Sequence, residues 1–142
     1  MSYTNKTQPT QVSPEEYLKE NFKGKESTQT TALKLIGLYS KATGFPCVMW
    51  NKIFGFGKYT YLDSKGGKHE FLITGFAVSS TGFTLYNMLG WKTFSTEIKN
   101  LGKFKLSGGS CLKIKNLEDV DQKLLMSIIK KSFTATQKKY KT

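Results

Sequence analysis

The chain has 142 residues and a formal net charge of +12, which comes from 22 lysines set against ten acidic residues, with no arginine. A chain of this length forms one domain around one core, because chains divide into several domains only above about 250 residues. No stretch approaches the ~18 consecutive apolar residues of a membrane-spanning helix. The composition therefore favours a single domain and argues against a helical membrane span.

The positive charge is concentrated after residue 27. Residues 1–27 hold four lysines and four glutamates, whereas the rest of the chain holds eighteen lysines and six acids. Lysine is a hydrated point charge, while arginine makes the bidentate contacts that phosphate and guanine favour. Two interpretations stay open. The lysines form an ordinary solvated surface, or they attract an anionic ligand such as a nucleic acid, a membrane surface or an acidic protein partner.

The first helix is predicted just after a polar N-terminal segment. Residues 1–12 are rich in threonine and glutamine, so we expect them to be disordered or loosely attached. Ser13 can act as the N-cap, with Pro14 at the first helical position and Glu16 completing a capping box. The helix is expected to end at Gly24.

A second helix is predicted over residues 30–43. Its apolar side chains recur at helical spacing, and a glycine stands where a C-terminal cap belongs. Phe45-Pro46 then turns the chain away, because a residue before proline disfavours the helical conformation. The residues that define this helix and its cap are Leu33, Ile36, Tyr39 and Gly44.

The middle of the chain, from Trp50 onwards, has the pattern of strands. Three are predicted, over residues 57–63, 68–78 and 83–89, with glycine-bearing turns between them. Two successive short connections make these strands an antiparallel meander.

The last third of the chain predicts helix, strand and helix. We expect a short helix over residues 95–101, a fourth strand over 110–115, and a last helix that opens at Asn116 with a capping contact from Asp119. Residues 136–142 are basic, and we expect a frayed tail. The expected buried face of the last helix is Leu117, Val120, Leu124 and Ile128.

These elements predict an α+β fold. We expect one domain over residues 13–135, in which an antiparallel sheet of about four or more strands packs against helices from the N- and C-terminal ends.

Several short motifs stand in a specific order between residues 28 and 132. They are Met49-Trp50, Gly57-Lys58-Tyr59-Thr60-Tyr61, Phe71-Leu72-Ile73-Thr74-Gly75-Phe76, Leu85-Tyr86, Leu101-Gly102-Lys103, Ser110-Cys111-Leu112 and Leu117-Glu118-Asp119-Val120-Asp121. This series resembles the YdhG-like family, a bacterial domain family of unknown function. The resemblance implies a helix–sheet sandwich, and some relatives are described as frataxin-like iron chaperones.

The sequence departs from the family pattern at two places. The family has a glycine after the tryptophan and a basic Pro-Arg-Lys run after the Gly-Phe motif, whereas this chain has Asn51 and Ala77-Val78-Ser79-Ser80. Any contact that the family makes through that arginine is lost here.

Iron binding, the activity implied by the resemblance, would need several carboxylate oxygens. The acidic groups are Glu15-Glu16 with Glu20, and Glu118-Asp119 with Asp121. Both fall in first turns of predicted helices, where acids favour the helix dipole without any ligand. A net charge of +12 also repels cations. We therefore expect no metal or other cofactor, with an iron chaperone as the alternative.

No catalytic constellation is recognisable in the sequence. His69, the single histidine, lies beside a hairpin turn and is expected to be an exposed strand residue. Cys47 and Cys111 are isolated, which favours a reducing cytoplasm, and we expect Cys47 to be a buried, inert thiol. Gly55-Phe56-Gly57-Lys58 lacks the spacing of a phosphate loop and enters a strand, so it predicts a bulge or a closely packed backbone.

The sheet supplies the main candidate binding surface. If its tyrosines and lysines share one open side, they form a stacking platform for unpaired bases. The other possibility is that the tyrosines are buried against the helices with their hydroxyls at the rim. The candidate surface residues are Trp50, Tyr59, Tyr61, Tyr86, Lys113 and Lys115.

The sequence thus predicts a cytoplasmic, non-enzymatic binding or accessory module with a basic surface and an anionic ligand or acidic protein partner. The alternatives are an iron chaperone, a weak single-stranded nucleic-acid binder, and an enzyme whose polar pocket has no recognisable motif.

Overall fold

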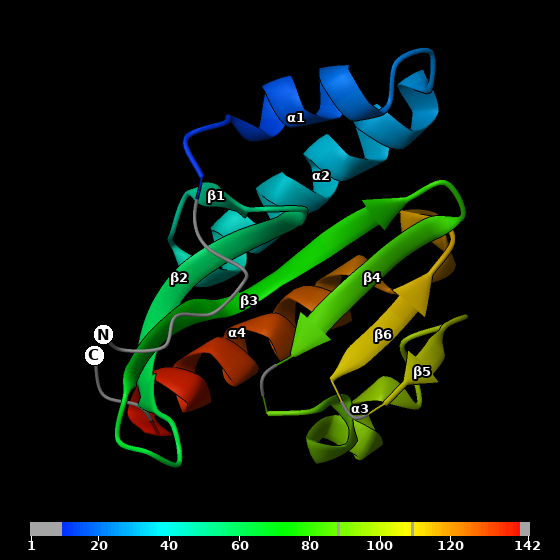
Figure 1. Ribbon diagram of the computed structural model, residues 1–142. Coiled ribbons are helices and arrows are strands. Elements are labelled where there is room, and N and C mark those ends of the chain that lie inside the picture. The colour runs from blue at the N-terminus through cyan, green and yellow to red at the C-terminus, as the bar shows by residue number, and fades with distance from the viewer. Residues whose placement is uncertain (1–9, 88, 109, 140–142) are drawn as a thin grey trace.

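The computed structural model describes residues 10–87, 89–108 and 110–139. In these ranges six strands form one antiparallel sheet in the order β1-β2-β3-β4-β6-β5 (Figure 1). The strands are β1 (Cys47–Trp50), β2 (Ile53–Leu62), β3 (Lys68–Ser79), β4 (Gly82–Asn87), β5 (Lys105–Ser107) and β6 (Cys111–Ile114). The α-helices are α1 (Pro14–Asn21), α2 (Glu26–Thr43), α3 (Ser95–Ile98) and α4 (Gln122–Lys139), with short 3-10 helices η1 (Trp91–Phe94) and η2 (Leu117–Asp119). The predicted α+β class is confirmed.

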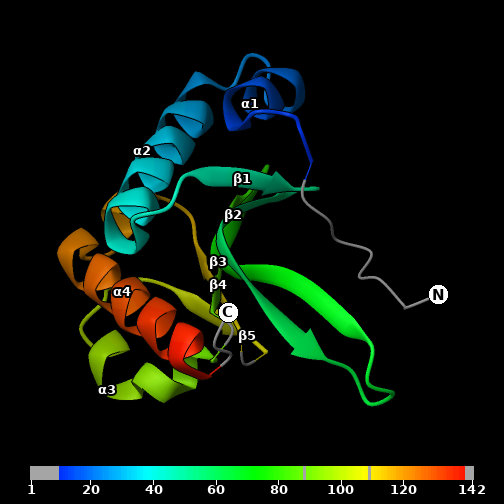
Figure 2. The same ribbon diagram turned by 90° about the vertical axis from the view of Figure 1, so that its left-hand side faces the viewer.

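The helices α2, α3 and α4 lie on the same side of the sheet (Figure 2). The core fills the space between them and the strands. In it, Tyr39 of α2 stacks on Phe56 of β2 with ring centroids 5.2 Å apart, and Phe54 stacks on Phe76 of β3 at 4.7 Å. In the part of the chain that the structure describes, no helix covers the opposite side of the sheet. The fold is therefore two layers, one of helices and one of strands.

Strand β4 shows how the sequence sets the two sides of the sheet. Its burial alternates strictly: Phe83, Leu85 and Asn87 are buried, whereas Thr84 and Tyr86 are half-buried. The buried side chains face the helices, because Asn87 Oδ1 accepts a 2.7 Å hydrogen bond from Ser132 Oγ on α4. Thr84 and Tyr86 must then lie on the helix-free side, since successive strand side chains point to opposite faces.

The predicted N-cap Ser13 and C-cap Gly44 are confirmed, but α1 ends at Asn21, before the predicted Gly24, and the predicted face of α2 is partly wrong. Ser13 Oγ accepts a hydrogen bond from Glu16 N, and Gly44 ends α2 in the left-handed conformation with φ of 78°. Tyr39 is buried as predicted, but Leu33 is 47% exposed and Ile36 only half-buried, because the positions before each of them, Ala32 and Leu35, face the core. The buried face of α2 is Ala32, Leu35, Tyr39 and Ala42.

Strands β1 and β5 were not predicted. β1 lies at one edge of the sheet. There the backbone N–H and the hydroxyl of Thr10 both donate hydrogen bonds to Met49 O. The expected loose attachment of residues 1–12 is therefore wrong for Thr10. Residues 1–9 lie outside the described ranges. β5 forms the other edge and has only three residues, all exposed.

The C-terminal helix differs from its prediction at both ends. Asn116 and Asp119 do form a capping box, but it caps the N-terminus of η2. The helix α4 begins only at Gln122. Leu125 is fully buried in α4, while the predicted Leu124 is half-buried. The helix continues to Lys139 and buries Thr136 completely, so the predicted tail boundary at residue 136 is wrong. Residues 140–142 lie outside the described ranges.

A two-residue turn, Asn51-Lys52, joins β1 to β2. Asn51 has a φ of 59°, and in the described ranges it is the single residue other than glycine with a positive φ. This conformation costs other side chains about 1–2 kcal/mol, while glycine and asparagine adopt it more readily. Asn51 therefore suits the place where the YdhG-like pattern has glycine.

Replacing Asn51 tests this turn. Asn51→Ala is expected to lower the free energy of unfolding by about 1 kcal/mol, because alanine adopts a positive φ with strain, whereas Asn51→Gly keeps or raises it. Urea unfolding followed by circular dichroism measures both. Lys52→Ala, at the exposed neighbouring position, is the control, and an Asn51→Ala midpoint equal to this control would contradict the explanation.

Candidate functional site

The helix-free side of the sheet is crossed by two rows of paired residues. The partners in each row share this side, because directly opposite residues in antiparallel strands point the same way. One row is Ile53, Ala77, Thr84, Lys113 and Lys105, and the other is Gly55, Gly75, Tyr86, Cys111 and Ser107. The β5–β6 end of this surface is thus polar and basic, whereas the β2–β3 end is apolar and carries the indole of Trp50, the cross-strand partner of Ile53.

A hollow of about 430 Å³ opens where the β3–β4 turn meets β5 and β6. Four lysines line it: Lys103, Lys105, Lys113 and Lys115. Ser79, Thr81 and Thr84 add hydroxyl groups, and the half-buried Phe104 adds apolar surface, whereas the side chains of Phe83 and Ile114 are buried in the core. We call this feature the lysine hollow.

Backbone pairing brings the four lysines together. Lys105 and Lys113 are direct cross-strand partners, and Lys115 follows β6 by one residue. Lys103 is held by a bridge between Gly102 and Val120 and by a 2.9 Å hydrogen bond from its own N–H to Asp119 O. A β-carbon on Gly102 would collide with that same carbonyl oxygen, so glycine is required for the close approach.

The lysine hollow has a large excess of positive charge. In the ranges that the structure describes, none of its four lysines forms an ion pair. Asp119 is the one acid in the lining, and its Oδ2 already accepts a 3.3 Å hydrogen bond from Asn116 N. Like charges held this close repel one another, which an anion bound between them would relieve.

The predicted surface residues separate into two groups. Lys113 and Lys115 line the hollow, and Tyr86 lies beside it on the same face. Tyr59 is 8% exposed and packs with Ile73 and Phe133. The prediction of one open tyrosine platform is therefore wrong for Tyr59.

Tyr61 and Trp50 are also occupied by packing. Tyr61 stacks on His69 with ring centroids 5.2 Å apart. Trp50 is 3% exposed, and its ring meets that of Phe71 at 5.9 Å. A β-carbon on Gly55 would lie 2.5 Å from Cδ1 of Trp50, so this glycine makes room for the indole. The predicted closely packed backbone at Gly55 is confirmed.

The sequence did not single out Lys103 and Lys105. Lys105 is the first residue of the three-residue strand β5, and Lys103 lies two residues before it. This short strand carries no apolar alternation, so no local pattern marked the segment as part of the sheet. The one sequence signal near Lys103 is the Leu101-Gly102-Lys103 motif. Its glycine allows the backbone to approach Asp119 O closely.

The cysteines and acids contribute little to the site. Cys47 and Cys111 are free thiols. Burial, with a contribution from Glu15, raises the pKa of Cys47 to about 12, which keeps that thiol protonated at neutral pH. In the described ranges no group of three or more histidine, cysteine, aspartate or glutamate side chains is arranged to hold a metal ion. None of the helices described is long and apolar enough to span a bilayer.

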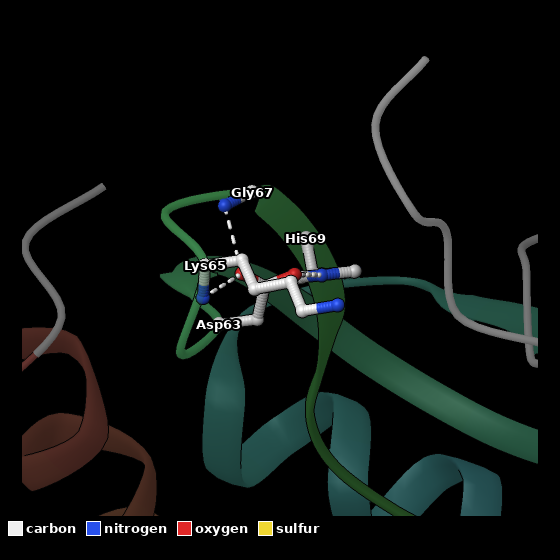
Figure 3. A network of polar contacts seen from close by, with 4 residues as sticks. All are labelled: Asp63, Lys65, Gly67 and His69. Atoms are coloured by element: carbon white, nitrogen blue, oxygen red, sulfur yellow. Dashed lines mark hydrogen bonds and ion pairs between the residues drawn. The ribbon is translucent and has the colours of Figure 1, made fainter.

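His69 is buried, which corrects the prediction of an exposed strand residue. It is 4% exposed, and its Nε2 lies 2.7 Å from Oδ2 of Asp63 (Figure 3). The backbone N–H groups of Lys65 and Gly67 donate to the other carboxylate oxygen, each at 2.8 Å. The hydrogen bond from His69, followed by that from Gly67, lowers the pKa of Asp63 below its ordinary value. The network ties the β2–β3 hairpin turn to the strand and serves the fold.

Acid titration tests this hairpin network. A carboxyl whose pKa is lowered by folding stabilises the protein above its unfolded pKa of about 4, and this stabilisation is lost as the pH falls. Asp63→Asn should therefore lower the melting temperature at pH 7, and its deficit relative to the wild type should shrink towards pH 3. Glu70→Gln, which removes an exposed ion pair with Lys58, is the control and should change little. A deficit of equal size at pH 7 and pH 3 would contradict this role of the Asp63 charge.

No protein-family model, curated protein or solved structure matches this chain. Membership of the YdhG-like family thus rests on the sequence motifs and stays a prediction.

Proposed function

We propose that this protein is a non-enzymatic binding module that holds an anionic ligand in the lysine hollow. One observation carries the proposal: four lysines converge on a single hollow whose lining contains one acid, and that acid is engaged in a helix cap. On an ordinary solvated surface the lysines would lie farther apart, because separation lowers the repulsion between like charges.

The shape of the hollow favours a ligand larger than a simple ion. Its volume of about 430 Å³ lies within the ~300–1,000 Å³ of typical ligand sites. The half-buried Phe104 lies in the same lining as the lysines. A ligand with several negative charges and a flat or apolar portion fits this lining best.

The chemistry of the lining supports binding rather than catalysis. The groups in the lysine hollow are ammonium ions, hydroxyls and one hydrogen-bonded carboxylate. Ammonium groups neutralise and position anions, whereas acid–base catalysis needs a group with a pKa near the working pH. We further propose a cytoplasmic location, which the two free cysteines support.

Isothermal titration calorimetry with tripolyphosphate tests the proposal. The double variant Lys113→Gln/Lys115→Gln should bind at least about tenfold more weakly, because each lysine near a surface contributes about 1 kcal/mol. Raising the salt concentration should weaken wild-type binding, since salt screens exposed charges.

The matched control is Lys23→Gln/Lys41→Gln. It removes the same number of charges, one from the connection between α1 and α2 and one from α2. Both control lysines are exposed and lie outside the lining of the hollow. Binding in this control should stay within about twofold of the wild type. Equal losses in the two double variants, or no binding by the wild type, would overturn the proposal.

A further inference from the structure

Tyr86 lies next to the lysine hollow on the helix-free face. Its cross-strand partner is Cys111, so Lys113 is its diagonal neighbour, at about 7–8 Å between backbones. Thr84, on the same side of the same strand, lines the hollow and pairs directly with Lys113. The aromatic ring and the lysines thus belong to one continuous surface.

The residues directly opposite Tyr86 on the neighbouring strands are small. Its partner on β3 is Gly75, which has no side chain, and its partner on β6 is the small Cys111. A β-carbon on Gly75 would collide with Phe54 O, so glycine is required there and β3 places no side chain directly opposite the ring. Tyr86 is half-buried, unlike the core tyrosine Tyr39.

The phenol of Tyr86 adds no negative charge to this surface. Burial and the neighbouring Cys111 raise its pKa above the ordinary value of 10, so the hydroxyl stays protonated at physiological pH. Tyr86 therefore adds a neutral ring to the face that carries Lys113 and the lysine hollow.

Unpaired nucleic acid combines the two features that this surface would recognise. Each nucleotide carries a flat aromatic base and a negative phosphate, and single-strand binders pair aromatic stacking with a basic groove. An acidic peptide would use the lysines but would have no need of a stacking surface. A simple phosphate compound would likewise make no use of the ring.

We propose that the anionic ligand is single-stranded nucleic acid, with one base stacked on Tyr86 and the adjoining phosphates held by Lys113 and its neighbours in the lysine hollow. This inference rests on the proposed function. Because the basic residues are all lysines, recognition depends on phosphate charge and stacking, and it tolerates many sequences.

Fluorescence anisotropy with fluorescein-labelled ten-nucleotide oligothymidylate and oligouridylate tests the inference. Tyr86→Leu keeps an apolar side chain but removes the ring, and it should weaken binding at least about fivefold. Tyr86→Phe keeps the ring and should bind within about twofold of the wild type. Lys113→Gln/Lys115→Gln should weaken binding. It should also reduce the slope of log affinity against log salt concentration by about one to two units.

Tripolyphosphate separates this inference from the proposed function. Its affinity should be the same in the wild type and in Tyr86→Leu, because it has no base to stack. If tripolyphosphate binds through the lysines while Tyr86→Leu binds the oligonucleotides as well as the wild type does, the nucleic-acid inference is wrong and the anion site stands.

Two further outcomes also decide against the inference. Tighter binding of polyglutamate than of either oligonucleotide would point to an acidic protein partner. No binding of oligonucleotide or tripolyphosphate by the wild-type protein would overturn both proposals.

Discussion

Burial of one side of the sheet under the helices is the constraint on which the rest of the structure depends. Each central strand must place its large apolar side chains on the side of α2 and α4, so its intervening residues face away from the helices. In β4 the side that faces the helices is marked by the hydrogen bond between Asn87 and Ser132 of α4, because buried polar groups need hydrogen-bond partners. Tyr86 and Thr84 lie on the helix-free side as a direct consequence.

The same constraint assembles the candidate site. Once Leu112 and Ile114 are buried in the core, Lys113 must face the helix-free side, where pairing with β5 sets Lys105 against it. The bridge between Gly102 and Val120 then holds Lys103 beside Asp119. The lysine hollow is therefore built by backbone pairing, and its concentration of positive charge would be complemented by the anionic ligand that we propose. We regard this as the physical basis of the proposed function.

The sequence predicted what depends on local chemistry and missed what depends on distant partners. The caps at Ser13 and Gly44 are decided within a few residues, and the structure confirms them; the Asn116–Asp119 capping box also forms, but on η2 and not on α4. β5 has three exposed residues and joins the sheet by pairing with β6, so its sequence carried no signal of a strand. His69 was misjudged for the same reason, because its burial depends on Asp63 across the hairpin. Lys113 and Lys115 were identified from strand alternation, whereas their convergence with Lys103 and Lys105 required the fold.

Nuclear magnetic resonance of the isotopically labelled protein, titrated with tripolyphosphate, tests the central claim most directly. The account predicts that the largest shifts fall on backbone amides of residues 79–84, 103–105 and 113–115, and that the side-chain ammonium signals of the four hollow lysines move with them. Shifts spread evenly over the lysines of α1, α2 and α4, with no preference for the lysine hollow, would contradict it.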